Sequence, residues 1–111
     1  MSNERLDPII HAPSRLRIMT TLTSLHDDEA MSFTKLKKLL GMTNGNLSVH
    51  LTKLENAGYV NIEKTFEGRK PATYIAATPQ GRQAFEDYLS NLQQLLSPVT
   101  GKPEADKGLR A

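Results

Sequence analysis

The most constraining feature of this sequence is the stretch Thr43–Gly58, TNGNLSVHLTKLENAG, which predicts one helix with a marked start and end. A threonine hydroxyl can accept a hydrogen bond from a first-turn backbone N–H, so Thr43 is a suitable cap. Glycine suits the left-handed residue that ends many helices, which explains Gly58. Leucines recur on one side at helical spacing: Leu47, Leu51 and Leu54. The helix therefore packs on one face only.

The other face of this helix is short-chained and rich in hydrogen-bonding groups, and Lys53 is its one cation. A solvated helix more often carries Glu–Lys pairs, whereas a face lying close to a ligand needs small side chains and donors. We therefore predict that this helix enters the major groove of DNA. Its predicted DNA-binding residues are Asn44, Gly45, Asn46, Ser48, Val49, Thr52, Lys53 and Asn56.

Length and composition limit the other choices. A chain of 111 residues is expected to form one domain with a single core. The absence of cysteine excludes disulfides, thiolate metal sites and cysteine nucleophiles. The N-terminus shows no apolar signal core and no run is long enough to span a membrane, so we expect a cytoplasmic protein without a membrane partner.

Charge is distributed unevenly along the chain. Residues 34–82 carry eight basic and three acidic residues, a balance of +5, whereas the remainder carries a balance of −3. A basic middle between acidic ends is expected when one face meets phosphates. Chance clustering is the alternative for numbers this small.

The N-terminal part predicts a short apolar segment followed by a helix. Residues 1–5 are expected to be frayed. Leu6, Ile9 and Ile10 have helical spacing, and we expect them to pack on the C-terminal helix or on a second subunit. Ser14 is predicted to cap a helix that runs to about Leu25.

The polar run His26–Ala30 allows two interpretations. Its histidine and acids could bind a metal ion, but one histidine with local acids and no second ligand cluster is more typical of a solvated turn. We therefore predict a turn, and neither a metal nor a cofactor for the chain.

A second helix is predicted from Thr34, as its cap, to about Leu40, with Leu36, Leu39 and Leu40 turned inward and its lysines outward. Met31–Phe33 before it reads as a short extended piece. Gly41 closes this helix, and the Thr43–Gly58 helix starts three residues later. Two helices joined by a short glycine-containing turn form the helix-turn-helix pattern.

The segment after these helices predicts a β-hairpin, or wing. Residues 59–65 alternate apolar and polar side chains, 66–71 form a turn around Gly68, and 72–77 return. The tip carries Arg69 and Lys70, and a guanidinium there can lie along phosphates or enter a narrow minor groove. An ordinary solvated tip is the alternative, favoured by Glu67. The predicted contacts to the DNA backbone and minor groove are Lys37, Lys38, Lys64, Arg69 and Lys70.

Thr78-Pro79 predicts the start of a last helix that runs to about Leu96. Its apolar seam favours a dimer contact, although folding back on its own domain would use the same pattern. The predicted dimer interface comprises Leu6, Ile9, Ile10, Phe85, Tyr88, Leu89, Leu92, Leu95 and Leu96. The DNA-binding domain is thus expected to span residues 1–96, with a disordered tail over residues 97–111.

The stretch SVHLTKLENAGYVNIEKTFEGRKPATYIAATPQGR resembles the winged-helix repressors of the MarR and ArsR type, and above all small single-domain winged helix DNA-binding regulators. The resemblance covers residue 6 to about residue 96. It implies a cytoplasmic, homodimeric transcription regulator in which Arg69 matches the wing arginine. Metal-sensing members of the ArsR type carry a Cys-x-Cys site, which this chain lacks.

The predicted fold is therefore α+β and mainly α: a winged helix-turn-helix with a two-stranded wing and a C-terminal dimerisation helix. The predicted function is a sequence-specific regulator of double-stranded DNA, a repressor, acting as a homodimer on a pseudo-palindromic operator. His50, at the edge of the leucine stripe, is interpreted as a packed or capping side chain in preference to a DNA contact. A small-molecule effector has room where the first and last helices of a dimer meet, but no polar residue there identifies it.

The sequence bears on two other functional classes. A winged helix can also bind proteins with the same surface, and Phe66 favours this alternative, a protein-interaction module without sequence-specific DNA binding. An enzyme is disfavoured, because the chain has no glycine-rich phosphate loop and no plausible catalytic set. Three scattered histidines, His11, His26 and His50, give no ligand spacing.

Overall fold

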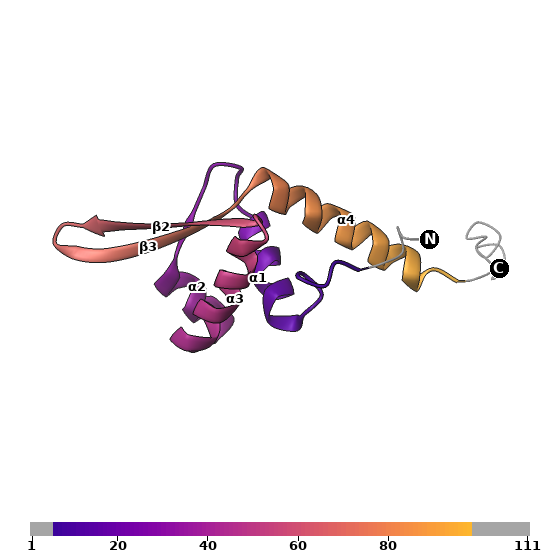
Figure 1. The fold of residues 1–111 in the computed structure, drawn as a ribbon, viewed down its shortest axis with the longest axis horizontal. Coiled ribbons are helices and arrows are strands. Elements are labelled where there is room, and N and C mark those ends of the chain that lie inside the picture. The colour runs from indigo at the N-terminus through magenta and orange to yellow at the C-terminus, as the bar shows by residue number, and fades with distance from the viewer. Residues whose placement is uncertain (1–5, 99–111) are drawn as a thin grey trace.

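The computed structural model describes residues 6–98, which form four helices and one antiparallel sheet (Figure 1). The elements in chain order are α1 (Pro13–Thr23), β1 (Met31–Ser32), α2 (Phe33–Leu40), α3 (Asn44–Asn56), β2 (Val60–Glu67), β3 (Lys70–Ala77) and α4 (Pro79–Leu96). The β2–β3 hairpin projects to one side of the helices, and α4 extends to the other (Figure 1). The predicted frayed residues 1–5 and most of the predicted tail, residues 99–111, lie outside the described residues.

Two helices begin earlier than their sequence predicts. α1 starts at Pro13, after Ala12 and without a side-chain cap, so the predicted cap at Ser14 is wrong. Proline fits the first helical position because its missing N–H would have no partner there. In α2 the hydroxyl of Ser32 accepts from the Lys35 N–H at 3.1 Å, so Ser32 and not Thr34 is the cap. Gly41 ends α2 with φ of 65°, as expected.

The sheet has three strands in the order β1-β3-β2, not the two predicted. The short extended piece at Met31–Ser32 pairs with Ile75 and Tyr74 of β3. β2 and β3 pair as far as Glu67 and Lys70, so the turn is shorter than predicted. Pro71 is tolerated inside β3 because β1 ends before it and leaves that edge of β3 open.

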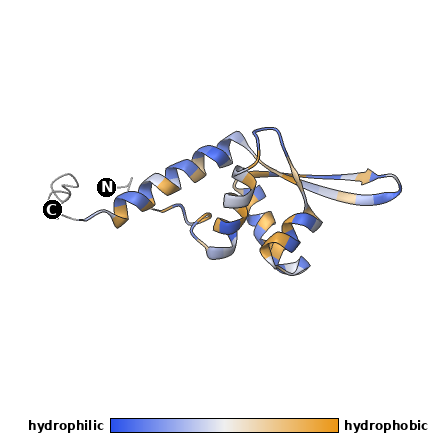
Figure 2. Ribbon diagram, turned by 180° about the vertical axis from the view of Figure 1, so that it is seen from behind, coloured by the Kyte–Doolittle hydropathy of each residue, from blue (hydrophilic) through white to orange (hydrophobic). Residues whose placement is uncertain are grey.

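The core lies between the first three helices, the base of the sheet, the first half of α4 and Ile10 of the N-terminal segment. Its buried residues are Ile10, Ile18, Met19, Leu22, Met31, Leu36, Leu40, Leu47, Leu51, Leu54, Val60, Ile75, Ala77, Phe85 and Tyr88. Figure 2 shows the hydrophobic sides of these helices turned toward one another. Leu39, predicted to point inward, is instead 56% exposed, because Leu36 and Leu40 already supply the inward face of the two-turn helix.

α4 begins as predicted, with the Thr78 hydroxyl accepting from Gly81 N–H at 2.8 Å. Its first half packs on its own domain, where Phe85 and Tyr88 are buried together with Ile10. The chain's own fold therefore covers these three members of the predicted dimer interface. Leu6, Ile9 and Leu92 are half-buried against the core, whereas Leu89, Leu95 and Leu96 are exposed.

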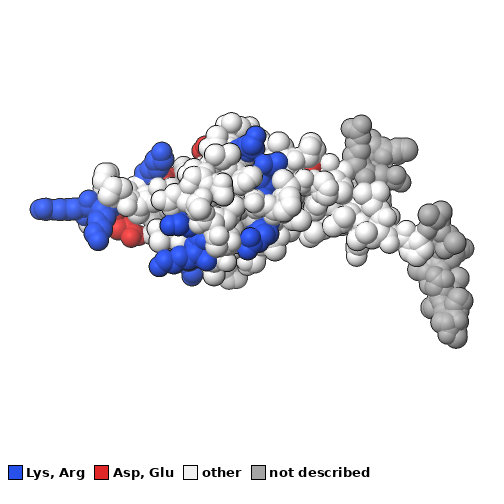
Figure 3. Space-filling model, turned by 90° about the horizontal axis from the view of Figure 1, so that it is seen from below, with Lys and Arg blue, Asp and Glu red and all other residues white. Residues whose placement is uncertain are grey.

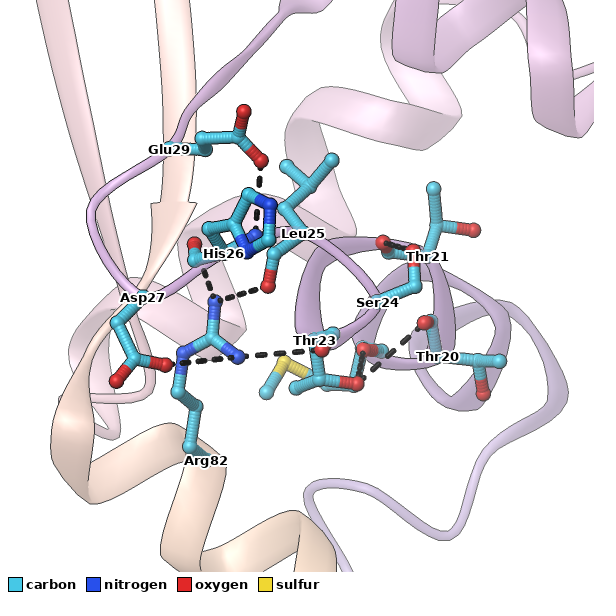
Figure 4. A network of polar contacts seen from close by, with 10 residues as sticks. Thr20, Thr21, Thr23, Ser24, Leu25, His26, Asp27, Glu29 and Arg82 are labelled. Carbon is cyan, nitrogen blue, oxygen red and sulfur yellow. Dashed lines mark hydrogen bonds and ion pairs between the residues drawn. The ribbon is translucent and has the colours of Figure 1, made fainter.

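Arg82 of α4 holds the C-terminal end of α1 (Figure 4). Its guanidinium donates to the carbonyl oxygens of Thr23, Leu25 and His26 at 3.0–3.1 Å. It also lies 3.6 Å from the exposed carboxylate of Asp27. A cation at these carbonyls satisfies groups that the helix leaves without partners and opposes the negative end of the helix dipole.

The 26–30 run forms a turn in which Glu29 accepts from the His26 N–H at 2.8 Å. Across residues 6–98 the structure brings no three histidine or acidic side chains together in a way that could hold a metal ion. No helix in that range has the length and apolar content needed to cross a membrane.

Candidate nucleic-acid interface

α3 is built as the sequence predicts. The Thr43 hydroxyl accepts from the Asn46 N–H at 3.1 Å, and Gly58 adopts φ of 83°. The Gly58 and Tyr59 N–H groups close the helix by donating to the carbonyls of Glu55 and Leu54, both at 2.9 Å. With the leucines of α3 buried, all eight residues predicted to bind DNA are exposed: Asn44, Gly45, Asn46, Ser48, Val49, Thr52, Lys53 and Asn56.

Thr52 and Gly45 each have a structural feature that bears on DNA binding. The Thr52 hydroxyl donates to the Ser48 carbonyl oxygen at 2.9 Å, so its proton is engaged within the helix. Its oxygen can still accept, which suits the amino group of adenine or cytosine in the major groove. Gly45 has open space where a side chain would start, so no residue in the described range 6–98 requires glycine there. A ligand that approaches the backbone closely is a physical reason for it.

A groove of about 630 Å³ runs between α3 and the base of the wing. It is lined by Phe33, Ser48, Leu51, Thr52, Glu55, Ile62, Lys64 and Thr73. Ser48 and Thr52 come from the exposed face of α3, and Lys64 comes from β2. The groove thus joins two sets of residues that the sequence assigned separately to bases and to phosphates.

The wing ends in a two-residue turn, Gly68-Arg69, in which Gly68 has φ of 68°. Glycine at the first turn position matches the hairpin turns that continue the twist of the strands. Arg69 and Lys70 are exposed at this tip, and Figure 3 shows cationic side chains there and over the helices nearby. The Tyr74 hydroxyl donates to the carboxylate of Glu67, which fixes this acid against β3.

The remaining cations divide between surface and scaffold. Lys37 and Lys38 occupy the last turn of α2, where positive charge also stabilises the C-terminal end of the helix dipole. Lys37 is half-buried and Lys38 is exposed. Arg82 counts toward the basic balance of residues 34–82, but its contacts with the end of α1 make it structural. The charge asymmetry along the sequence therefore overstates the charge available to phosphates.

His50 is tied to α1 by Arg15. Arg15 Nη1 lies 3.2 Å from His50 Nδ1, and because arginine can only donate, Nδ1 must accept. The proton of the neutral ring is then on Nε2. The pKa of His50 is lowered by partial burial and further by the positive charges of Arg15 and Lys53. No local signal reveals this pair, since 35 residues separate its members.

The segment before α1 connects three parts of the fold. Arg15 Nε donates to the Ile9 carbonyl at 2.5 Å, and His11 Nδ1 lies 2.8 Å from the Tyr88 hydroxyl of α4. The Tyr59 hydroxyl donates to Asp7 at 2.5 Å, just beyond α3. Burial, followed by this hydrogen bond and the charge of Asp7, raises the pKa of Tyr59 to about 12.

A second cleft, of about 540 Å³, lies between this N-terminal segment and α4. Its lining residues are Leu6, Asp7, Pro8, Ala84, Asp87, Tyr88 and Asn91. The cleft thus borders the Asp7 and Tyr88 side chains that hold the segment in place.

Comparison with known proteins identifies the family. Residues 14–96 match the model of the winged helix DNA-binding domain. An uncharacterized protein of Methanocaldococcus jannaschii is 37% identical over 87 residues, which cover 78% of this chain and 91% of that protein.

Solved structures agree with this assignment. A transcriptional regulator homologue from Pyrococcus horikoshii superposes with a TM-score of 0.76 at 29% identity, over 86% of this chain and 95% of that chain. AbfR bound to DNA shares the fold, with a TM-score of 0.65 at 20% identity, over 89% of this chain and 71% of that chain. This chain belongs to the winged helix DNA-binding domain family.

Proposed function

We propose that this protein is a sequence-specific regulator of transcription that represses by binding a pseudo-palindromic operator in double-stranded DNA as a homodimer. The observation that carries the proposal is the groove shared by Ser48 and Thr52 of α3 and Lys64 of the wing. A duplex whose major groove holds α3 brings a phosphate row to the wing on the same side. Ser48 and Thr52 can therefore contact base edges while Lys64 contacts a phosphate of the same duplex.

The roles of the residues follow from their positions on α3. Asn44, Asn46 and Ser48, near the N-terminal end, reach the base edges, as the first residues of recognition helices do. The unpaired N–H groups at this end favour a phosphate. Lys38, Lys53 and the wing cations bind further phosphates and supply affinity that does not depend on sequence.

The homodimer is assigned to the end of α4. Leu89, Leu95 and Leu96 are 45%, 49% and 75% exposed, and this end points away from the wing (Figure 1). Pairing there with a second copy would bury these leucines and leave both α3 helices free. Each α3 would then meet one half-site, with half-sites about 10 bp or a multiple of this apart.

The dimer assignment is tested by sedimentation of the full chain. Leu95→Glu combined with Leu96→Glu is expected to shift a dimer to a monomer that remains folded by circular dichroism, because neither leucine belongs to the core. Gln93→Glu combined with Gln94→Glu, which adds the same charge at exposed neighbours, is the control. A dimer that persists in the double variant rules out this end of α4 as the interface.

The DNA-binding assignment is tested by selecting duplexes from a random library with the full chain. Affinity for the selected site and for its scrambled sequence is then measured by fluorescence anisotropy at one salt concentration. We expect the selected sites to share an inverted repeat and to bind about 10³-fold or more tightly than the scrambled duplex. Failure to enrich any sequence, with no binding even at low salt, contradicts the proposal.

One observation favours a second function, a protein-interaction module. Phe66, Val49 and Leu39 are 67%, 56% and 56% exposed near the same surface, and exposed apolar groups commonly mark protein contacts. The library selection separates the two functions, because a protein-interaction module would not enrich a DNA sequence.

A further inference from the structure

The two faces of the wing differ in a way that the proposed function does not use. Residues directly opposite each other in an antiparallel pair share a face. Ile62 pairs with Ile75, whose side chain is fully buried, so this pair marks the face turned toward the helices. Lys64–Thr73 and Phe66–Pro71 are the next two pairs on the same face.

This inner face carries no carboxylate along the hairpin. Its paired residues are Val60, Ala77, Ile62, Ile75, Lys64, Thr73, Phe66 and Pro71. Both acids of β2, Glu63 and Glu67, lie on the opposite face, together with Tyr74, which binds Glu67. The Phe66 ring and Lys64 therefore lie on the face of the wing that borders the groove, whereas Glu63 and Glu67 lie on the other face.

Phe66 has no packing role that explains it. Its side chain is 67% exposed, and the core ends at Ile62. Figure 2 shows the corresponding hydrophobic segment at the end of β2, near the tip of the wing. Lys64 lies on the same face two residues before Phe66, and Arg69 occupies the turn at the tip, whereas Lys70 pairs with Glu67 and lies on the opposite face. The occupant that suits this surface is anionic at its edges and apolar between them.

The minor groove of DNA has this character, because its walls are deoxyribose and its rims are phosphate. Phe66 lies four residues beyond Ile62, which is about 13 Å at ~3.3 Å per residue. The major groove is about 12 Å wide. A wing that starts beside a helix in the major groove thus reaches, at Phe66, across one phosphate row to the neighbouring minor groove.

We propose that Phe66 packs against the deoxyribose walls of the minor groove flanking the site of α3, where it selects against the guanine N2 amino group. This inference rests on the proposed function and adds a residue that determines flanking sequence. Apolar side chains in the minor groove are a known mode of DNA contact, and guanine is the base that adds an amino group to the groove floor. The contact therefore favours A·T over G·C at the flank.

Inosine–cytosine pairs separate minor-groove from major-groove effects. They present the major-groove groups of G·C but lack the amino group in the minor groove. With the full chain, selected duplexes that carry A·T, I·C or G·C at the flank are titrated by anisotropy. We expect A·T and I·C flanks to bind alike and G·C flanks about tenfold more weakly. Phe66→Ala is expected to reduce this difference to about twofold or less.

Thr65→Ala is the matched control, because Thr65 is an exposed neighbour on the opposite face of β2 and should leave the flank preference unchanged. Hydroxyl-radical footprinting provides a second readout, since the radical attacks deoxyribose: wild type should protect the flanking sugars and Phe66→Ala should not. Equal preference and equal protection in wild type and Phe66→Ala overturn the inference while leaving the proposed function intact. Wild-type protein that selects no duplex refutes both.

Discussion

Arg15 Nη1 and His50 Nδ1 lie 3.2 Å apart, and this contact joins the first helix directly to the helix assigned to the major groove. Arg15 also binds the Ile9 carbonyl, so one guanidinium connects the N-terminal segment, α1 and α3. The orientation of α3 therefore depends on a residue that does not itself belong to its exposed face.

Replacing Arg15 tests this connection. Arg15→Met removes the donor to His50 and to Ile9 but retains much of the side-chain volume, and is expected to lower the free energy of unfolding by about 1–3 kcal/mol. Without the neighbouring positive charge, the pKa of His50 should rise toward its ordinary value, as measured by NMR titration. Arg17→Met, an exposed arginine on the same helix, is the control. An unchanged pKa of His50 in Arg15→Met would refute the contact.

The lowered pKa of His50 predicts a pH dependence of stability. Near its ordinary pKa of about 6.5 the unfolded chain binds a proton that the folded chain still excludes, so the folded state is favoured less as pH falls. The contribution of His50 is complete above about pH 6.5 and is lost as the pH falls through the lowered pKa. Urea unfolding of wild type and His50→Gln between pH 5 and 8 measures this difference. A wild type whose stability does not fall more steeply than that of His50→Gln contradicts the assignment.

Substitution by alanine is expected to have opposite effects at Gly81 and Gly45: it should lower stability at Gly81 and DNA affinity at Gly45. A Cβ at Gly81 would lie 2.1 Å from the Tyr59 carbonyl oxygen, so Gly81→Ala must displace the backbone. It is expected to lower the free energy of unfolding by about 1–3 kcal/mol. Gly45 has open space, so Gly45→Ala should retain stability and lose affinity only for the selected DNA. Thermal unfolding and anisotropy measure the two effects. Unchanged DNA affinity in Gly45→Ala would mean that DNA does not approach this backbone closely.

Substitutions at Arg69 and Arg82 are expected to separate a contribution to DNA affinity from a contribution to stability. Arg69→Ala at the exposed tip should leave stability unchanged, weaken binding to all sequences and reduce the salt dependence by about one ion. Arg82→Met should lower stability by about 1.5–3 kcal/mol through lost contacts with α1, with the salt dependence unchanged. Urea unfolding and salt titrations of binding provide the measurements. A salt dependence that falls in Arg82→Met but not in Arg69→Ala would reverse these assignments.

The sequence predicts features set by neighbouring residues and misses those set by distant ones. The Thr43 cap, the Gly58 end and the Thr78-Pro79 start are local, and all three are confirmed. The choice of Ser32 over Thr34 as a cap accompanies the pairing of β1 with β3, more than 40 residues away. Either hydroxyl fits the local pattern, so only this pairing distinguishes them.

The same limit applies to the candidate interface. Helical periodicity identifies which residues of α3 are exposed, but it cannot show that Ser48 and Thr52 share a groove with Lys64. Nor can it reveal that Arg82 is engaged by the end of α1, because an arginine in a basic stretch looks like any other cation. The apolar seam of α4 was likewise ambiguous, since burial in its own core and pairing with a second copy use one periodicity.

The central claim is that the exposed face of α3 reads DNA sequence. The most direct test is the ratio of affinities for the selected operator and its scrambled duplex, measured at one salt concentration for wild type and for Asn46→Ala combined with Ser48→Ala. We predict a ratio of about 10³ or more for wild type and a loss of about 2–6 kcal/mol of discrimination in the variant, with unchanged affinity for the scrambled duplex. A variant that retains the wild-type ratio, or loses affinity equally for both duplexes, would contradict the claim.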